Sequence, residues 1–226
     1  RERYLALLAN ELGENADEQR TRTMLRRFAT RERARVALRE VLPRGAGGAD
    51  VDETSRELAM LADATLEAAL AEAVRWAEHR FGRAVTTAGN PAGFVILGMG
   101  KLGGEELNAG SDVDLIYFYD SDAGEVIDPE GDASGMTLNE YWQRVARRLT
   151  ATIEDSTEDG PVWRVDLRLR PEGGAGPLVN SLAAAERYYE SFGRLWERAA
   201  MLRARPVAGD LALGKLLLES LASFVW

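Results

Sequence analysis

The sequence predicts an α/β (α+β) chain in which a helical N-terminal region precedes a small mixed sheet flanked by helices. Residues 1–42 are rich in Ala, Leu, Glu and Arg with apolar positions at helical spacing. Short apolar runs that are typical of buried strands begin only at Phe94, and helical patterns alternate with them afterwards. We therefore divide the chain into a helical region, residues 1–90, and a core with its following helices, residues 91–226.

The helical region has two predicted parts. Residues 1–42 form the first, and residues 55–82 form the second, which carries an apolar stripe and stops at Gly82. The glycine-rich segment Pro43–Asp50 is a loop between them. Thr86–Gly93 is a turn that marks the boundary with the core.

The core alternates between strands and helices. Phe94–Leu97 and Val113–Tyr119 are apolar enough to be buried strands, and Asp120–Gly135, rich in Asp, Gly and Ser, is a long loop suited to act as a lid. The remaining predicted elements are a helix over residues 137–155, a strand over Val162–Leu169, a helix over residues 181–204 with a break at Gly193, and an apolar helix over Leu211–Trp226.

Composition narrows the possible functions. The 226 residues are 46% hydrophobic and 29% charged, as in globular proteins, and the net charge of -9 argues against general binding to nucleic acid or an anionic membrane. Cysteine is absent, which excludes a disulfide framework and fits a reducing, cytoplasmic location. No apolar run approaches the ~20 residues of a membrane span. Because the chain begins with Arg1, we expect a piece of a longer protein.

The stretch Gly100–Asp114 carries the strongest chemical signal. A glycine-rich turn, Gly100-Lys101-Leu102-Gly103-Gly104, is followed by Ser111-Asp112-Val113-Asp114. On a β-strand the i, i+2 spacing places Asp112 and Asp114 on the same face. Paired carboxylates beside a turn that phosphate can approach are what Mg²⁺-dependent phosphoryl or nucleotidyl transfer requires.

A third carboxylate comes from the predicted strand over residues 162–169, which alternates strictly. Its apolar residues Trp163, Val165, Leu167 and Leu169 point one way. Asp166 points the other way between arginines, and pairing of this strand beside the second buried strand would bring it to the aspartate pair. Three carboxylates would then hold two Mg²⁺ ions roughly 3.5–4 Å apart. Arg168 and Arg170 would bind phosphate oxygens.

Other interpretations of these motifs are weaker. Gly98–Gly103 matches G-x-G-x-x-G after a strand, and Asp120 ends the next strand, as in dinucleotide-binding folds. However, the crossover that ends at Ser111 is too short for a βαβ helix. A Walker A loop is excluded because Lys101 is followed by Leu102 rather than Ser or Thr. Each motif alone is common in solvated strands and turns, and only their combination favours a site.

The order of glycine turn, Asp-x-Asp and later strand aspartate resembles the DNA polymerase β-type nucleotidyltransferase superfamily, although Gly100-Lys101 stands where that superfamily has Gly-Gly or Gly-Ser. A narrower resemblance is to the bacterial glutamine synthetase adenylyltransferase/adenylyl-removing enzymes. It rests on Gly98–Asn108, Ser111–Ile116 and Val165–Pro171. Shorter matches that complete the resemblance, over about residues 93–210, are Gly176–Val179, Trp196–Arg198, Arg203–Arg205 and Gly209–Asp210.

The resemblance implies a polymerase β-like core and a role in nitrogen regulation. Members of this family carry two such units: an N-terminal one removes AMP from a tyrosine of glutamine synthetase by phosphorolysis, and a C-terminal one attaches AMP from ATP. Gly98-Met99-Gly100, Leu107-Asn108 and Gly176-Pro177-Leu178-Val179 are more similar to the adenylyl-removing unit; the adenylylating unit is the alternative. The implied partners are glutamine synthetase, phosphate with ADP or ATP, and a PII-type signalling protein.

By the same resemblance, Asp112, Asp114 and Asp166 would ligate two Mg²⁺ ions while phosphate attacks the α-phosphorus of the adenylyl-tyrosine to give ADP. In the adenylylating direction Asp166 would instead act as general base. The residues expected at the nucleotide or phosphate are Gly100, Lys101, Gly103, Gly104, Ser111, Arg168 and Arg170. A non-catalytic docking module and a nucleotidyltransferase for small molecules are the remaining alternatives, and the intact aspartates argue against the first.

Overall fold

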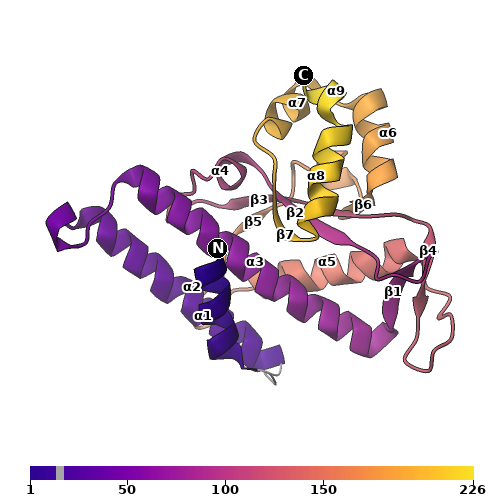
Figure 1. Ribbon diagram of the computed structural model, residues 1–226, viewed down its shortest axis with the longest axis horizontal. Coiled ribbons are helices and arrows are strands. Elements are labelled where there is room, and N and C mark those ends of the chain that lie inside the picture. The colour runs from indigo at the N-terminus through magenta and orange to yellow at the C-terminus, as the bar shows by residue number, and fades with distance from the viewer. Residues whose placement is uncertain (14–17) are drawn as a thin grey trace.

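A computed structural model of the chain, which describes residues 1–13 and 18–226, has a small mixed sheet between two layers of helices (Figure 1). The first layer consists of α1 (Glu2–Leu12), α2 (Glu18–Val41), α3 (Val51–Phe81) and α5 (Leu138–Glu154). The second consists of α6 (Leu182–Phe192), α7 (Leu195–Met201), α8 (Leu211–Ser220) and α9 (Ala222–Val225). The predicted fold class is confirmed. Across the described ranges, no helix combines the length and apolarity needed to cross a bilayer.

The sheet contains both strand directions. At its centre β2 (Phe94–Gly98) and β3 (Val113–Tyr119) pair antiparallel, and β7 (Arg205–Gly209) pairs antiparallel with β2. On the other edge of β3, β5 (Val165–Asp166) and β6 (Val179–Ser181) both run parallel to it. The two predicted central strands are therefore present, with β3 at its predicted bounds.

Both faces of the central strands are buried. Ile96 and Tyr117 belong to a hydrophobic cluster with side chains of α3 and α5, whereas Val95 and Phe118 belong to a second cluster with α6, α8 and α9. A strand covered on both faces reads as a continuous apolar run, which is why the sequence revealed these two. Because the first cluster also includes residues of α1 and α2, one core joins the helical region to the sheet; the division near residue 90 stays a prediction.

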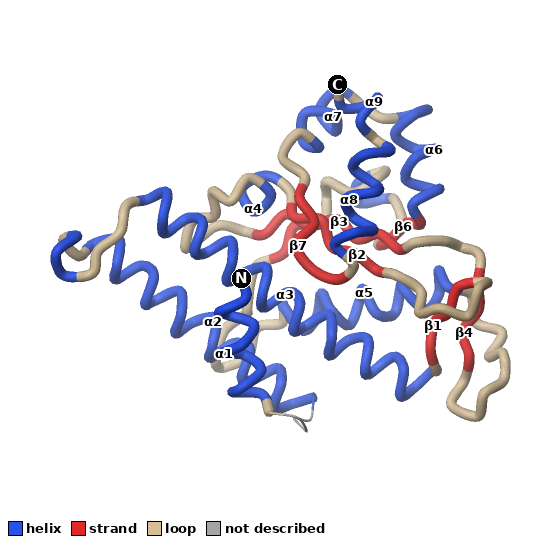
Figure 2. Tube along the Cα trace, viewed as in Figure 1, coloured by secondary structure: helices blue, strands red, loops and turns tan. Residues whose placement is uncertain are grey.

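The predicted lid, Asp120–Gly135, is wrong in part because it contains a strand. β4 (Gly124–Ile127) pairs antiparallel with β1 (Arg83–Thr86), and the two form a separate ribbon at the end of α3 (Figure 2). Val126 of β4 is fully buried. Gly82 permits the sharp exit from α3, since its φ is 97° and a Cβ there would lie 1.9 Å from the Ile127 carbonyl oxygen.

The predicted strand over residues 162–169 is shorter in the structure, where only Val165–Asp166 pair with β3. The chain turns immediately afterwards because the backbone N–H of Arg168 donates to Asp166 Oδ1 at 2.8 Å. The predicted inward position of Trp163 is nevertheless confirmed. Its side chain is 1% exposed, and its Nε1 donates to Thr65 Oγ1 of α3 at 2.9 Å.

Helix ends follow local capping. α3 begins at Val51 rather than residue 55, because Asp50 and Glu53 form a reciprocal capping box. The predicted break at Gly193 is confirmed, since it separates α6 from α7. The predicted final helix is divided at Leu221 into α8 and α9. Within the predicted helical stretch 1–42, residues 14–17 lie outside the described residues.

A charged cluster joins α1, α2 and α3. Glu57 of α3 accepts hydrogen bonds from Tyr4 Oη at 3.1 Å and Arg35 Nη2 at 2.6 Å, and it pairs with Arg39. Burial opposes ionisation of Glu57, but the hydrogen bond and charge of Arg35 and the charge of Arg39 outweigh it. The pKa of Glu57 is therefore below its ordinary value.

We expect this cluster to make stability depend on acid pH. Because folding lowers the pKa of Glu57, its contribution is fully present above the ordinary glutamate pKa of about 4.3 and is lost as pH falls through the lowered folded-state value. Glu57→Gln should therefore reduce the free energy of unfolding at neutral pH and flatten its decline in acid. Urea unfolding measured across that range tests this, with the exposed Glu2→Gln as control; parallel curves for Glu57→Gln and wild type would contradict it.

A second prediction concerns the shared core. Leu66 of α3 is fully buried, whereas Leu38 of α2 is 56% exposed. Leu66→Ala should lower the free energy of unfolding by about 2–5 kcal/mol through lost burial and a cavity, and Leu38→Ala should change it by less than about 0.5 kcal/mol. Far-ultraviolet circular dichroism and tryptophan fluorescence should report one coincident transition. Two separate transitions would show that the helical region and the sheet do not share a core.

Candidate active site

The antiparallel pairing of β2 and β3 brings the glycine turn to the aspartates. Gly98, at the end of β2, lies opposite Leu115 near the start of β3. The turn, which contains the short helix α4 (Gly100–Gly103), therefore leaves the sheet beside Asp114, the second residue of β3. The backbone N–H of Met99 donates to the Asp114 carbonyl oxygen at 2.9 Å and fixes this junction.

The third aspartate arrives by parallel pairing. In the register of β3 and β5, Val113 lies opposite Val165, and Asp114 lies opposite Asp166. The i, i+2 spacing places Asp112 on the same side as Asp114. The strand pairing expected from the sequence is thus present, and it makes Asp114 and Asp166 direct neighbours at the edge where the turn leaves β2.

The three carboxylates have different surroundings. Burial raises the pKa of Asp114, and the negative charges of Asp166 and Asp112 add to this effect against the opposing charges of Arg168 and Lys101. Asp166 accepts hydrogen bonds from Arg168 Nε at 2.9 and 3.0 Å, which hold the pKa of its carboxyl below the usual range. Asp112 pairs with Arg164, the residue before β5. Asp114 is therefore the carboxylate whose surroundings are least favourable to its own negative charge.

The donor set suits a hard cation. In residues 1–13 and 18–226, no three Asp, Glu or His side chains stand ready-made as a metal-binding group. The side-chain positions explain this, since Asp112 faces Arg164 Nε at 2.6 Å and Asp166 faces Arg168. Oxygen ligands alone favour Mg²⁺ over metals that prefer nitrogen or sulfur. The residues therefore fit Mg²⁺ in type and charge. To bind the ion, Asp112 and Asp166 would release Arg164 and Arg168, with which they are paired in this structure.

The glycines of the turn serve close packing. Gly100 has a φ of 52°, and a Cβ there would lie 2.7 Å from Asp114 Oδ2. A Cβ on Gly103 would lie 1.8 Å from the carbonyl oxygen of Arg203. The N–H groups of Gly103 and Gly104 donate to the carbonyls of Met99 and Gly100 at 3.0 and 3.1 Å. Phosphate binding by these two glycines stays a prediction.

The other predicted phosphate ligands divide into two groups. Lys101 Nζ donates to Ser111 Oγ at 3.3 Å, and Arg168 lies with Asp166 at the aspartate edge. Arg170 is directed elsewhere: Nη1 donates to the Leu167 carbonyl at 2.7 Å and Nε to the Pro177 carbonyl at 3.1 Å. In this structure Arg170 organises the loop after β5, while Lys101, Ser111 and Arg168 remain beside the carboxylates.

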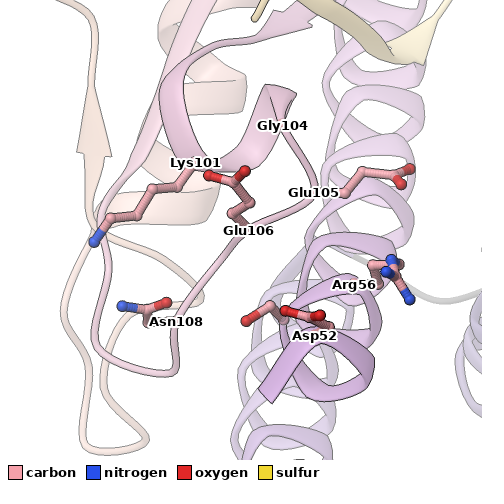
Figure 3. Close-up of a pocket in the computed structure, with 8 residues that line it drawn as sticks. Asp52, Arg56, Lys101, Gly104, Glu105, Glu106 and Asn108 are labelled. Carbon is pink, nitrogen blue, oxygen red and sulfur yellow. The ribbon is translucent and has the colours of Figure 1, made fainter. Parts of the chain in front are cut away.

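A polar cavity of about 420 Å³ lies between the glycine turn and α3 (Figure 3). The turn and the segment after it contribute Lys101, Gly104, Glu105, Glu106 and Asn108, and α3 contributes Asp52, Ser55 and Arg56. Figure 3 shows the Lys101 side chain pointing away from α3 while Glu106 lies between the two walls. The helical region therefore forms one wall of a cavity that adjoins the turn, a contribution that the sequence did not reveal.

Sequence reasoning also missed three side chains that hold the site. Arg164 pairs with Asp112 and donates to the Gly110 carbonyl at 2.9 Å, although its outward position on the alternating strand was a usable signal. Arg205 of β7 donates to the Leu102 and Gly103 carbonyls of the turn. Asp63 of α3 pairs with Arg205, and its only signal was a lone charge within an Ala- and Leu-rich helical stretch.

Comparison with known proteins identifies a family for this chain. The family described as glutamate-ammonia ligase adenylyltransferase matches residues 1–220. Two relatives named bifunctional glutamine synthetase adenylyltransferase/adenylyl-removing enzyme, from Nitrosococcus oceani and Pseudomonas aeruginosa, are 44% and 42% identical over 98% and 97% of this chain. The chain spans 22% of the length of each. Because the family match extends over nearly all of its residues, the chain belongs to the glutamate-ammonia ligase adenylyltransferase family.

Proposed function

We propose that this chain is a nucleotidyltransferase unit that removes AMP from an adenylylated tyrosine of glutamine synthetase by phosphorolysis. The observation that carries the proposal is the register of β3 and β5, with Asp114 beside Asp166 where the glycine turn leaves β2. Family membership supports adenylyl transfer as the reaction class. The similarity of Gly98-Met99-Gly100 and Gly176-Pro177-Leu178-Val179 to adenylyl-removing units favours the removing direction.

The proposed reaction exchanges one bond at phosphorus. An oxygen of inorganic phosphate bonds to the α-phosphorus while the bond from that phosphorus to the tyrosine oxygen breaks. The products are ADP and a free tyrosine side chain, whose oxygen takes a proton from solvent. Asp112, Asp114 and Asp166 would hold Mg²⁺, which supplies neutralisation of charge on the phosphoryl oxygens. Asp114 is half-buried and faces two like charges, so a bound cation would stabilise its ionised form more than that of the other two aspartates.

Arg164 and Arg168 fit a supporting role at the phosphates. Their side chains are 69% and 84% exposed, so they can move without disturbing the core. They balance the charges of Asp112 and Asp166 now, and a planar guanidinium released from a carboxylate binds phosphate oxygens in bidentate fashion. Lys101 adds a compact positive charge from the turn itself.

The direction of transfer is tested with purified glutamine synthetase. We expect the chain, with Mg²⁺ and phosphate, to release ADP from adenylylated glutamine synthetase and to incorporate no labelled AMP from ATP into the unmodified enzyme. The residue similarities of the turn and the Gly176–Val179 segment are the reason for this expectation. Incorporation without release would assign the adenylylating direction instead. Binding to glutamine synthetase with neither reaction would favour a docking module.

Removing one central carboxylate should abolish the reaction. Because the charge at Asp114 would be lost from the cation site, we expect Asp114→Asn to reduce turnover by at least about 100-fold. We expect Mg²⁺ to raise the melting temperature of wild type, because it binds the folded state, and we expect the same variant to lose that rise. Glu130→Gln, an exposed carboxylate-to-amide change in the loop after β4, is the matched control. Wild-type turnover by Asp114→Asn would rule out the carboxylate mechanism.

A further inference from the structure

The glycine turn is held from the sheet face opposite to the aspartates. Arg205, in β7, lies opposite Gly98 of β2 in the strand register. Its Nε donates to the Gly103 carbonyl at 3.3 Å, and its Nη2 donates to the Leu102 carbonyl at 3.1 Å. The Leu102 carbonyl also accepts from the backbone N–H of Glu105 at 3.2 Å, whereas Arg205 donates to the Gly103 carbonyl, one of the helix-end carbonyls that have no partner within α4.

Arg205 is itself fixed by a buried carboxylate. Asp63 of α3 accepts from Nη1 at 2.7 Å and from Nη2 at 3.1 Å, and its side chain is only 5% exposed. Burial raises the pKa of Asp63, and the charge and hydrogen bonds of Arg205 oppose this effect. The two-pronged geometry leaves the guanidinium little freedom to rotate. The turn, β7 and α3 are thereby connected through a single side chain.

Stability is a poor explanation for this ion pair. Withdrawing two charges from water carries a large desolvation penalty, and well-packed apolar residues of similar volume often replace such a pair without loss of stability. The neighbours of Asp63 on α3, Ala62, Ala64 and Leu66, are buried apolar residues that an apolar replacement would match. What an apolar pair does not supply is the donor to the Gly103 carbonyl and the second donor to the Leu102 carbonyl. The distinctive property of the pair is therefore where it places the turn.

The position of the glycine turn determines the surroundings of Asp114. Gly100 approaches Asp114 so closely that a Cβ would lie 2.7 Å from its Oδ2, and Lys101 reaches Ser111 next to Asp112. A shift of the turn by a fraction of an ångström would change both contacts. Misplacement by about 1 Å at a distance from the chemistry reduces rates by about 100-fold.

We propose that Arg205 and Asp63 are positioning residues: Asp63 orients the Arg205 guanidinium, which holds the Leu102 and Gly103 carbonyls and so places the glycine turn against Asp114. The inference rests on the proposed nucleotidyl transfer for its kinetic consequence alone. Its structural consequence, order in the turn, is independent of which reaction the site performs. Both residues act through the turn, because Arg205 donates to Asp63 and to the turn carbonyls.

The first test uses conservative replacement. Arg205→Lys keeps the positive charge near Asp63 but lacks the planar fork that reaches both carbonyls. We expect kcat to fall by about 100-fold while KM for the adenylylated protein stays within about twofold, because the replacement shifts the turn without removing any of the groups proposed to bind substrate. Arg198→Lys is the matched control, since Arg198 also donates to chain carbonyls, those of Val225 and Trp226, at 2.8 and 3.0 Å. Equal kcat values for Arg205→Lys and wild type would overturn the proposal.

The second test separates positioning from folding. The double variant Asp63→Leu/Arg205→Met replaces the ion pair with apolar residues, and we expect its stability to equal or exceed that of wild type. Its kcat should nevertheless fall as in Arg205→Lys. Hydrogen exchange of the Gly103–Glu106 amides should accelerate about tenfold, with α3 and β2 unchanged. Unchanged exchange in the turn, or equal acceleration throughout the chain, would overturn the proposal. If wild type proves inactive in both directions of transfer, the proposed function fails, but the hydrogen-exchange result still tests the positioning role. A failure of the function and a failure of the positioning role are therefore distinguishable.

Discussion

Burial of β2 and β3 on both faces is the constraint from which the candidate site follows. Helices cover the two faces. Every residue of β2 is buried, and so is every residue of β3 except Asp114. An unpaired charge along such a strand would be costly, so charged residues are confined to the strand ends. Antiparallel pairing places the end of β2 against the start of β3. The glycine turn and the aspartates meet at this junction because the helix layers no longer cover the strands there, so that polar groups can reach solvent.

The aspartates and the Asp63–Arg205 ion pair lie on opposite faces of the sheet at this edge. Asp114 has the same strand parity as Ile116 and Phe118, whose side chains pack toward α6 and α8. Arg205 instead reaches Asp63 on α3, on the opposite side. Negative charge thus accumulates on one face while the ion pair that holds the turn is buried on the other. The arginines that pair with the aspartates, Arg164 and Arg168, are exposed and free to move, whereas Arg205 is fixed by Asp63 and does not pair with the site carboxylates.

Long elements were predictable from the sequence and short ones were not. The apolar run Val113–Tyr119 gave both bounds of β3, and alternation correctly placed Trp163 inward and Asp166 beside the aspartate pair. β1 and β6 have 4 and 3 residues, too few for a period of two to emerge. β7 has 5 residues, as β2 does, but it lacks the continuous apolar run of β2 and contains Pro206, which is tolerated because β7 is an edge strand.

The side chains that hold the site were hidden for a different physical reason. The Asp63–Arg205 pair joins residues 142 positions apart in the chain, and no local pattern encodes such a contact. Arg170 looked equivalent to Arg168 on an ideal strand, but the turn after Asp166 redirects it to backbone carbonyls. In both cases tertiary geometry decides between side chains that the sequence presents alike. Chemistry-bearing residues were therefore easier to find than the residues that orient them.

The helical region acts as a structural part of the site rather than as a preface to it. α3 contributes Leu66 to the core beneath the sheet, Arg56 to the cavity beside the glycine turn, and Asp63 to the pair that holds it. Removing residues 1–90 would expose the part of the apolar sheet face that α3 covers and α5 does not, and would leave the Arg205 guanidinium without its carboxylate. Such a large apolar face is not maintained in water by an isolated sheet. The physical unit that presents the three aspartates therefore includes the N-terminal helices, even though every chemistry-bearing residue lies after them.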